Sequence, residues 1–307
     1  MAEVMTVLGP VPSDQLGVVL PHEHVFIDLV KVLPNFDFQL IDPDLVTREV
    51  ARFRAAGGGT LVEVTTDRAM GRDPEGLRRV AAATGLHIVM GCGWYREPWY
   101  DRERIRRATA NELSECLVHE IERGFEGTGV RPGIIGEIGA DQDYVSPAEE
   151  RVLRAAARAH HRTGLTITLH ARASQVGAQQ LDILEEERVD PRRVIVGHCD
   201  TYPYPEYHVA LAKRGAWVQF DTVRGVHEYV VERRLAFVLE MARHRLLHRV
   251  LLSQDVCALS HLHAFGGTGY DYVLTGFVPR LRQAGLTDED IHMLLVENPR
   301  RALVGEA

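Results

Sequence analysis

The feature that most constrains the fold is a unit that recurs along the whole chain: a short apolar run followed by a longer amphipathic segment. Each run is rich in Val, Ile or Leu and has the length of a β-strand. Seven intervals separate the first run from the eighth, and they average about 33 residues, which is the length of a βα unit. The eight runs are Gly17–Leu20, Thr60–Val64, His87–Gly91, Gly133–Ile138, Thr166–Leu169, Val194–Gly197, Trp217–Phe220 and Val250–Leu252.

The segments between these runs have the spacing of amphipathic helices. Three of them follow a side chain that can cap a helix and a proline suited to the first turn, in Asp42-Pro43, Asp73-Pro74 and Ser146-Pro147. Glycines that suit helix ends follow four of them, at Gly57, Gly85, Gly164 and Gly215. We expect helices over Pro43–Ala56, Asp73–Thr84, Arg102–Arg123, Pro147–Thr163, Ala173–Arg188, Glu206–Lys213 and Glu228–His244, and others around Asp271–Gln283 and Asp288–Glu297.

Eight apolar strands that alternate with helices predict an α/β protein, a (β/α)8 TIM barrel. A doubly wound open sheet is the rival, but its first strand normally leads into a glycine-rich phosphate turn. Here that turn reads Leu20-Pro21-His22-Glu23-His24. No Pro/Gly/Ser-rich linker or low-complexity tract divides the chain, so we expect one barrel domain over residues 1–307.

Composition excludes several classes of function. The net charge of -8, from 35 basic and 43 acidic residues, argues against a partner that is a nucleic acid or a membrane surface. No apolar stretch approaches the roughly 20 residues of a membrane helix, and Met1–Gly9 does not resemble a secretory signal. Four scattered cysteines suggest reduced thiols, so we expect a cytoplasmic protein.

Metal-ligating residue types stand at the carboxyl ends of the predicted strands, where TIM barrels carry their function. They are His22, His24, Glu137, His170, His198 and Asp255. Alternation along a strand points His22 and His24 in the same direction. Imidazole and carboxylate ligands suit zinc and neighbouring divalent metals. Six ligands exceed the need of one open catalytic zinc, so the set favours two metals bridged by a carboxylate.

With these motifs the sequence resembles the phosphotriesterase family of the amidohydrolase superfamily over essentially its whole length, and most of all the branch of phosphotriesterase homology proteins. The motifs are Pro21–His24, Gly136–Gly139, Thr168–His170, Gly197–Asp200, Leu251–Asp255, Ser260–Leu262, Gly269–Tyr272 and Glu297–Pro299. The resemblance implies that His22, His24 and Asp255 hold a buried ion. It implies that His170 and His198 hold a more exposed ion and that Glu137 bridges the two. Zn²⁺ is the expected metal, with Mn²⁺, Co²⁺ or Fe²⁺ as alternatives.

The bridging position departs from part of that family. Phosphotriesterase itself and the lactonases use a carbamylated lysine there, whereas this chain has Glu137. Its two lysines, Lys31 and Lys213, lie far from the fourth strand in sequence. Glutamate is shorter than carbamyl-lysine, so the departure weakens the expectation of organophosphate hydrolysis more than the expectation of metals.

The reaction that the resemblance implies is hydrolysis. A metal-bridging hydroxide would attack an ester, lactone, amide or phosphoester centre, and Asp255 would handle the proton. The alternative is a non-catalytic or weakly catalytic metal-containing protein that binds a small molecule on the same fold. A deaminase or a nuclease is a third reading, and the net acidic charge speaks against the nuclease.

Four side chains are candidates for substrate contact: Tyr95, Arg172, Arg224 and His261. Loop packing is the plain alternative for Tyr95, and a salt-bridged position at the rim is the plain alternative for Arg172. Two or three arginines at the mouth would favour a small molecule with a carboxylate, phosphate or sulfonate. Symmetric homo-oligomers are the general expectation, and relatives commonly pair as homodimers.

Overall fold

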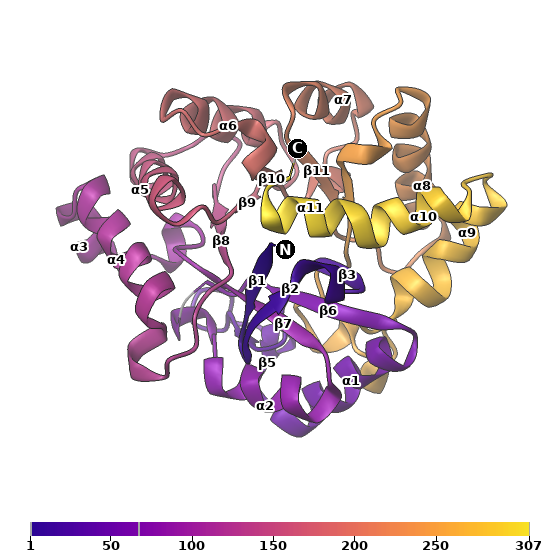
Figure 1. Cartoon of the computed structure of the whole chain (residues 1–307), viewed down its shortest axis with the longest axis horizontal. Coiled ribbons are helices and arrows are strands. Elements are labelled where there is room, and N and C mark those ends of the chain that lie inside the picture. Colours follow the sequence, from indigo (N-terminus) through magenta and orange to yellow (C-terminus); the bar gives the residue numbers. More distant parts are fainter. Residues whose placement is uncertain (1, 67, 307) are drawn as a thin grey trace.

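An eight-stranded parallel sheet forms the centre of the computed structural model, which describes residues 2–66 and 68–306. The strands neighbour each other in the order β12-β11-β10-β9-β8-β7-β6-β3, and helices surround them (Figure 1). The two end strands meet where the Asp255 amide donates to the His22 carbonyl at 3.2 Å. The sheet is therefore nearly closed, and the predicted α/β barrel is confirmed. The strands are β3 (Val18–Glu23), β6 (Gly58–Glu63), β7 (His87–Cys92), β8 (Ile134–Gly139), β9 (Ile167–His170), β10 (Val194–Val196), β11 (Trp217–Phe220) and β12 (Val250–Leu252).

Each observed strand lies within a few residues of its predicted run. Six of the eight have only buried residues, and β3 and β7 each begin with one partly buried residue before five buried ones. A strand that is buried on both faces cannot show polar alternation, which is why the runs read as continuous apolar segments. The sheet register, such as Thr60 beside His87 in β6 and β7, brings all the carboxyl ends to one face of the barrel.

The predicted helix starts are confirmed at three caps. Asp42 accepts from the amides of Asp44 and Leu45, Asp73 accepts from Gly76, and Ser146 forms a capping box with Glu149. The helices are α1 (Pro43–Ala55), α2 (Pro74–Thr84), α3 (Arg102–Arg107), α4 (Ala110–Arg123), α5 (Pro147–Thr163), α6 (Val176–Glu186), α7 (Pro205–Arg214), α8 (Glu228–Arg243), α9 (Val278–Gln283), α10 (Asp288–His292) and α11 (Asn298–Val304).

The prediction of one helix over Arg102–Arg123 is wrong. Ala108 is extended (ψ 144°), so α3 ends before it. A new helix begins behind Thr109, whose hydroxyl accepts from the Glu112 amide at 3.2 Å. The Glu112 carboxylate in turn accepts from the Thr109 amide at 2.7 Å. This capping box satisfies donors that a continuous helix would use differently.

Three features of the ends and loops were not predicted. The chain opens with a hairpin of β1 (Glu3–Thr6) and β2 (Gly9–Pro12), and the Val7 amide beyond β1 donates to the Ile88 carbonyl of β7. A second hairpin of β4 (Ile27–Asp28) and β5 (Gln39–Leu40) follows β3. Helical structure continues past Glu297, where the predicted helix ends, because α11 follows. Pro299 lies in the first turn of α11, where a proline is tolerated. Among the described residues, none of the helices is both long enough and apolar enough to span a membrane.

Candidate metal centre

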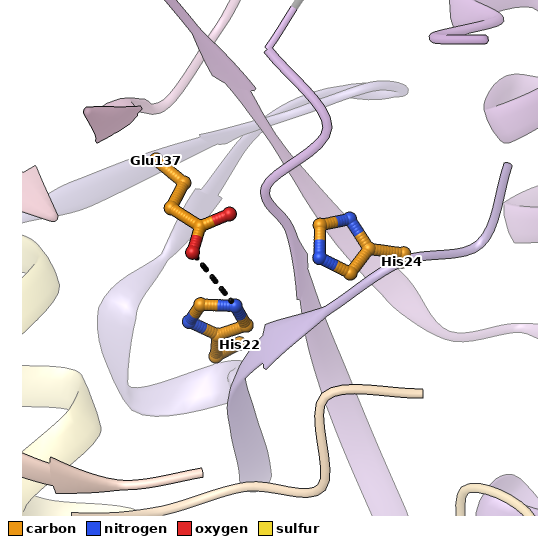
Figure 2. A group of neighbouring side chains, drawn as sticks. All are labelled: His22, His24 and Glu137. Carbon is orange, nitrogen blue, oxygen red and sulfur yellow. Dashed lines mark ion pairs between the residues drawn. The ribbon is translucent and has the colours of Figure 1, made fainter. Parts of the chain in front are cut away.

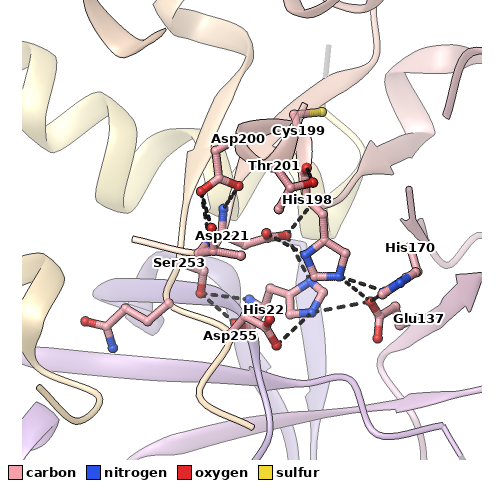
Figure 3. Close-up of polar contacts among 12 residues, drawn as sticks. His22, Glu137, His170, His198, Cys199, Asp200, Thr201, Asp221, Ser253 and Asp255 are labelled. Atoms are coloured by element: carbon pink, nitrogen blue, oxygen red, sulfur yellow. Dashed lines mark hydrogen bonds and ion pairs between the residues drawn. The ribbon is translucent and has the colours of Figure 1, made fainter. Parts of the chain in front are cut away.

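The six side chains predicted as metal ligands lie together at the carboxyl ends of the strands (Figure 3 shows five of them). A single oxygen of Glu137, on β8, faces three imidazoles. Its Oε1 lies 2.5 Å from His170 Nδ1, 2.9 Å from His198 Nε2 and 3.6 Å from His22 Nε2. These imidazoles come from β9, from the residues after β10, and from β3. Strands far apart in sequence therefore bring their donors to one carboxylate.

His24 and Asp255 complete the cluster on the β3 side. Figure 2 shows the rings of His22 and His24 beside Glu137. The Asp255 Oδ1 atom lies 3.4 Å from His24 Nε2 and 3.8 Å from His22 Nε2. Among the described residues, donor atoms within 4.8 Å of one another fall into three groups, and two of them share Glu137: one with His22 and His24, the other with His170 and His198. Two ions with a bridging glutamate would use the residues in this way.

The state of His22 supports a fit to a metal. This side chain is fully buried, and neither of its ring nitrogens makes a hydrogen bond within the described part of the chain. A buried polar atom without such a partner costs roughly 1–3 kcal/mol. A cation held between the His22 ring, Glu137 and Asp255 would remove that cost. The donor set of imidazoles and carboxylates is the one that zinc and its neighbours prefer.

Charge points the same way. Burial alone would raise the pKa of Glu137, but the imidazoles of His170 and His22 hold it well below its usual range. Burial would also raise the pKa of Asp255, and the hydrogen bond from His24 keeps it low. Burial lowers the pKa of His170 to about 3, although the charge of Glu137 opposes the shift. Two ionised carboxylates in a buried site attract a cation.

Asp221 is a residue of this centre that sequence reasoning missed. Its buried carboxylate accepts from His198 Nδ1 at 2.8 Å and from the His198 amide at 2.9 Å. The same carboxylate lies 3.3 Å from His22 Nδ1. Its partner His198 has a left-handed backbone (φ 56°), which is uncommon for a non-glycine residue. Asp221 thus orients the ring that faces Glu137, and the signal for it was a carboxylate directly after a predicted strand.

Glu23, in the middle of the His22-Glu23-His24 motif, holds the segment that carries Asp255. It is fully buried, and one of its oxygens accepts from Ser253 Oγ at 2.7 Å and the Gln254 amide at 2.8 Å. The other accepts from the Val256 amide at 2.9 Å. Asp255 itself has a left-handed φ of 51°. Burial raises the pKa of Glu23 to about 7, although these donors oppose the shift.

A cavity of about 310 Å³ opens over the centre, and all four candidate substrate contacts line it. Tyr95 meets His170 edge to face, with ring centroids 4.8 Å apart. Arg224 is committed to the protein, because its Nη1 donates to the Asp255 carbonyl and to His261 Nδ1. His261 therefore packs beside Arg224, whereas Arg172 is exposed.

Comparisons with known proteins agree with this geometry. The model of the phosphotriesterase family matches residues 2–303. The chain is 38% identical to the phosphotriesterase homology protein of Escherichia coli, over 93% of this chain and 97% of that protein. It is 29% identical to the N-acetyltaurine hydrolase of Xenopus tropicalis, over 98% and 97% of the two chains.

Solved structures are similar as well. The crystal structure of the Escherichia coli protein, which holds phosphate in its active site, matches with a TM-score of 0.91 over 94% of this chain and 99% of that one. A lactonase from Listeria monocytogenes matches with a TM-score of 0.92 at 27% identity, over 98% of this chain and 99% of that one.

Proposed function

The chain belongs to the phosphotriesterase family and is a hydrolase of that family, and we propose that two divalent metal ions, most readily Zn²⁺, act at its strand-end centre. The observation that carries this proposal is the single Glu137 oxygen that faces imidazoles from three strands. His22, His24 and Asp255 would hold one ion, and His170 and His198 the other. Glu137 would take part in both sites.

The chemistry that such ions supply when bound is an ionised water at neutral pH and a polarised substrate oxygen. The chain's own part is to move the proton and hold the substrate. Asp255 is an ionised carboxylate with 13% of its side chain exposed to the cavity, so it can accept a proton from the nucleophile and deliver it to the leaving group. Arg224 fixes the Asp255 backbone and lies 4.0 Å from its Oδ2.

We propose that the bond that this protein hydrolyses is an ester, lactone or amide bond. One similar protein, the N-acetyltaurine hydrolase, is named for the hydrolysis of an amide, and another, the lactonase, for the hydrolysis of a lactone. Glu137 in place of a carbamylated lysine makes an organophosphate a weaker candidate. Arg172 and Tyr95 would contact the substrate, and the exposed guanidinium of Arg172 favours an anionic small molecule. The alternative function is binding of a small molecule without turnover.

Turnover with and without a chelator tests this function. Metal-replete protein should hydrolyse at least one member of a panel of lactones, N-acyl compounds and carboxylic or phosphoric esters, and the chelator should abolish the reaction. We expect Asp255→Asn to lower kcat by about 10²–10⁴-fold, because proton transfer is lost. Asp143→Asn, at an exposed acid of the β8–α5 connection, is the matched control and should change little.

Two outcomes would count against the proposal. A near-normal kcat in Asp255→Asn, with both ions retained, would overturn the role of Asp255. Tight binding of a panel compound with no turnover by the metal-replete protein would favour the alternative function.

A further inference from the structure

The cavity over the metal centre has one apolar wall. It comes from the connection behind β3 and from the short helical turn behind β6, and its side chains are Ile27, Leu29, Leu33, Phe38 and Met70. The hairpin geometry fixes this wall, because the Leu29 amide donates to the Phe38 carbonyl at 3.0 Å. Ser260 donates from its amide and its hydroxyl to Asp37, at 2.7 Å each, and so holds the wall against the connection behind β12.

The facing wall is polar and cationic. It comes from the connections behind β9, β10 and β11 and from α8, and it carries Arg172, Thr201, Thr222, Arg224 and Arg234. Arg234 is committed to Asp200 at 2.7 Å, and Arg224 to the Asp255 carbonyl and His261. On the other side of the cavity Arg96 pairs with Asp141 at 3.1 Å. Within the described ranges, Arg172 is the cavity arginine with no ion pair or hydrogen bond.

Strand order separates these two walls across the centre. Around the barrel, β3, β6 and β7 precede β8, and β9, β10 and β11 follow it. Glu137 stands on β8, so the apolar wall and Arg172 lie to either side of the carboxylate that would join the two ions. A bond cleaved over Glu137 therefore has an apolar environment on one side and an unpaired guanidinium on the other.

We propose that the substrate is an anionic amphiphile, a small amide or ester with an alkyl chain on one side of the scissile bond and an anionic group on the other. This inference rests on the proposed hydrolytic function and adds the substrate class. The alkyl chain packs along Leu29, Phe38 and Leu33, and the anion pairs with Arg172. A carboxylate or sulfonate suits a guanidinium, which offers paired donors in one plane.

The apolar wall also determines how the length of the substrate's alkyl chain affects binding. The cavity, at about 310 Å³, is at the small end of ligand pockets, so it encloses only part of an extended chain. Leu29 is buried, whereas Leu33 is 36% exposed and stands at the rim. A short acyl group therefore stays beside Leu29 and Phe38, and a longer one reaches Leu33.

Binding of a graded series to the metal-loaded protein tests the inference by isothermal titration calorimetry, with turnover recorded in parallel. The probes are the acetyl, butyryl, hexanoyl and octanoyl amides of taurine, and the same acyl amides of ethanolamine as uncharged partners. The Kd of the taurine amides should fall with each methylene that reaches the wall, by about fourfold per methylene. Arg172→Gln should weaken every taurine amide about tenfold and leave the ethanolamine amides unchanged.

Leu33→Asp should weaken the octanoyl compound and spare the acetyl compound. Leu33 is an exposed loop residue, so its replacement leaves the core intact. The control variants are Leu8→Asp, at an exposed leucine of the β1–β2 hairpin, and Arg106→Gln, at an exposed arginine of α3. Both controls should bind the series as the wild type does.

The inference is overturned if Kd is independent of chain length, if the uncharged amides bind as well as the taurine amides, or if Leu33→Asp weakens all members equally. The proposed hydrolytic function fails separately. In that case the chain-length and charge dependence of Kd appear as expected, and the bound amides, like the ester and lactone panel, remain uncleaved.

Discussion

The candidate metal centre depends on a few carboxylates that position imidazoles. Asp221 is the clearest case, since it accepts from both nitrogen donors of His198, the ring Nδ1 and the backbone amide. A carboxylate at Nδ1 keeps a proton there, so Nε2, which lies 2.9 Å from Glu137 Oε1, is the ring atom that would bind a metal. The His22 Nδ1 atom faces the same carboxylate. One aspartate thus orients the His198 imidazole of one donor group and lies beside the His22 imidazole of the other.

Asp221→Asn should weaken metal binding by about 10–100-fold, the range known for carboxylates that support metal-bound histidines. The amide nitrogen of asparagine would oppose the His198 Nδ1 proton and favour the tautomer with its proton on Nε2. The measurement is a titration of zinc against a chromophoric chelator. Asp143→Asn serves as the control, and an affinity in Asp221→Asn within about twofold of the wild type would contradict the positioning role.

At the scale of residues, the sequence predicts which imidazoles and carboxylates gather at the strand ends, but not which carboxylates support them. His22, Glu137, His170 and His198 stand out because imidazoles and carboxylates are rare at the ends of apolar strands. Asp221 and Glu23 also lie at strand ends, but they form hydrogen bonds to other side chains and to loop backbone. Which backbone amides a carboxylate will reach depends on loop conformation, such as the left-handed Asp255, which a sequence pattern does not specify.

At the scale of elements, a buried histidine at the end of α5 makes the stability of the fold depend on pH. His160 lies in the last turn, is 8% exposed, and donates from Nδ1 to the Leu165 carbonyl at 2.7 Å ahead of β9. Burial holds the pKa of His160 below its usual value. Below the unfolded pKa the unfolded chain therefore binds more protons at this residue than the folded chain does, so stability falls as pH falls.

The variant His160→Gln should lose less stability than the wild type between neutral pH and about pH 5. Glutamine can still donate to the Leu165 carbonyl, but it takes up no proton in this range. Urea unfolding of both proteins at several pH values measures the difference. Parallel curves for the two proteins would show that His160 contributes nothing to the pH dependence.

The break between α3 and α4 shows why element boundaries are harder to predict than elements. Helical spacing runs through Arg102–Arg123, and the apolar face of α4 alone buries Leu113, Leu117 and Ile121. Thr109 and Glu112 nevertheless have the spacing of a capping box, a signal that periodicity does not include. The β4–β5 hairpin is harder still, because each of its strands has only two residues.

At the scale of the whole molecule, the recurring βα unit determines the barrel and so the common face where the candidate ligands meet. The closure of the sheet places residues from β3 and β12 together, although they are separated by more than two hundred positions. The Ser253 hydroxyl, for instance, contacts both the His22 amide and Glu23. The alternation of apolar runs and amphipathic segments predicts this architecture, because each buried strand of a parallel barrel is covered by a helix.

Metal binding should also stabilise the whole fold. An ion held at about one hundred times its Kd adds about 2.7 kcal/mol, which corresponds to a rise in Tm of about 5 °C for a chain of this size. Removal of metal by a chelator should lower the Tm of the wild type by that order. Glu137→Gln, which weakens both predicted sites, should show a smaller chelator effect in the same calorimetric scan. An equal chelator effect in both proteins would place the stabilising ion elsewhere.

The central claim is that two divalent ions share Glu137. Anomalous diffraction at the zinc edge, from crystals of the zinc-loaded protein, tests it most directly. We predict two peaks per chain: one contacting His22, His24 and Asp255, the other contacting His170 and His198, with Glu137 between them. A single peak, or peaks that leave Glu137 without a metal contact, would contradict the account.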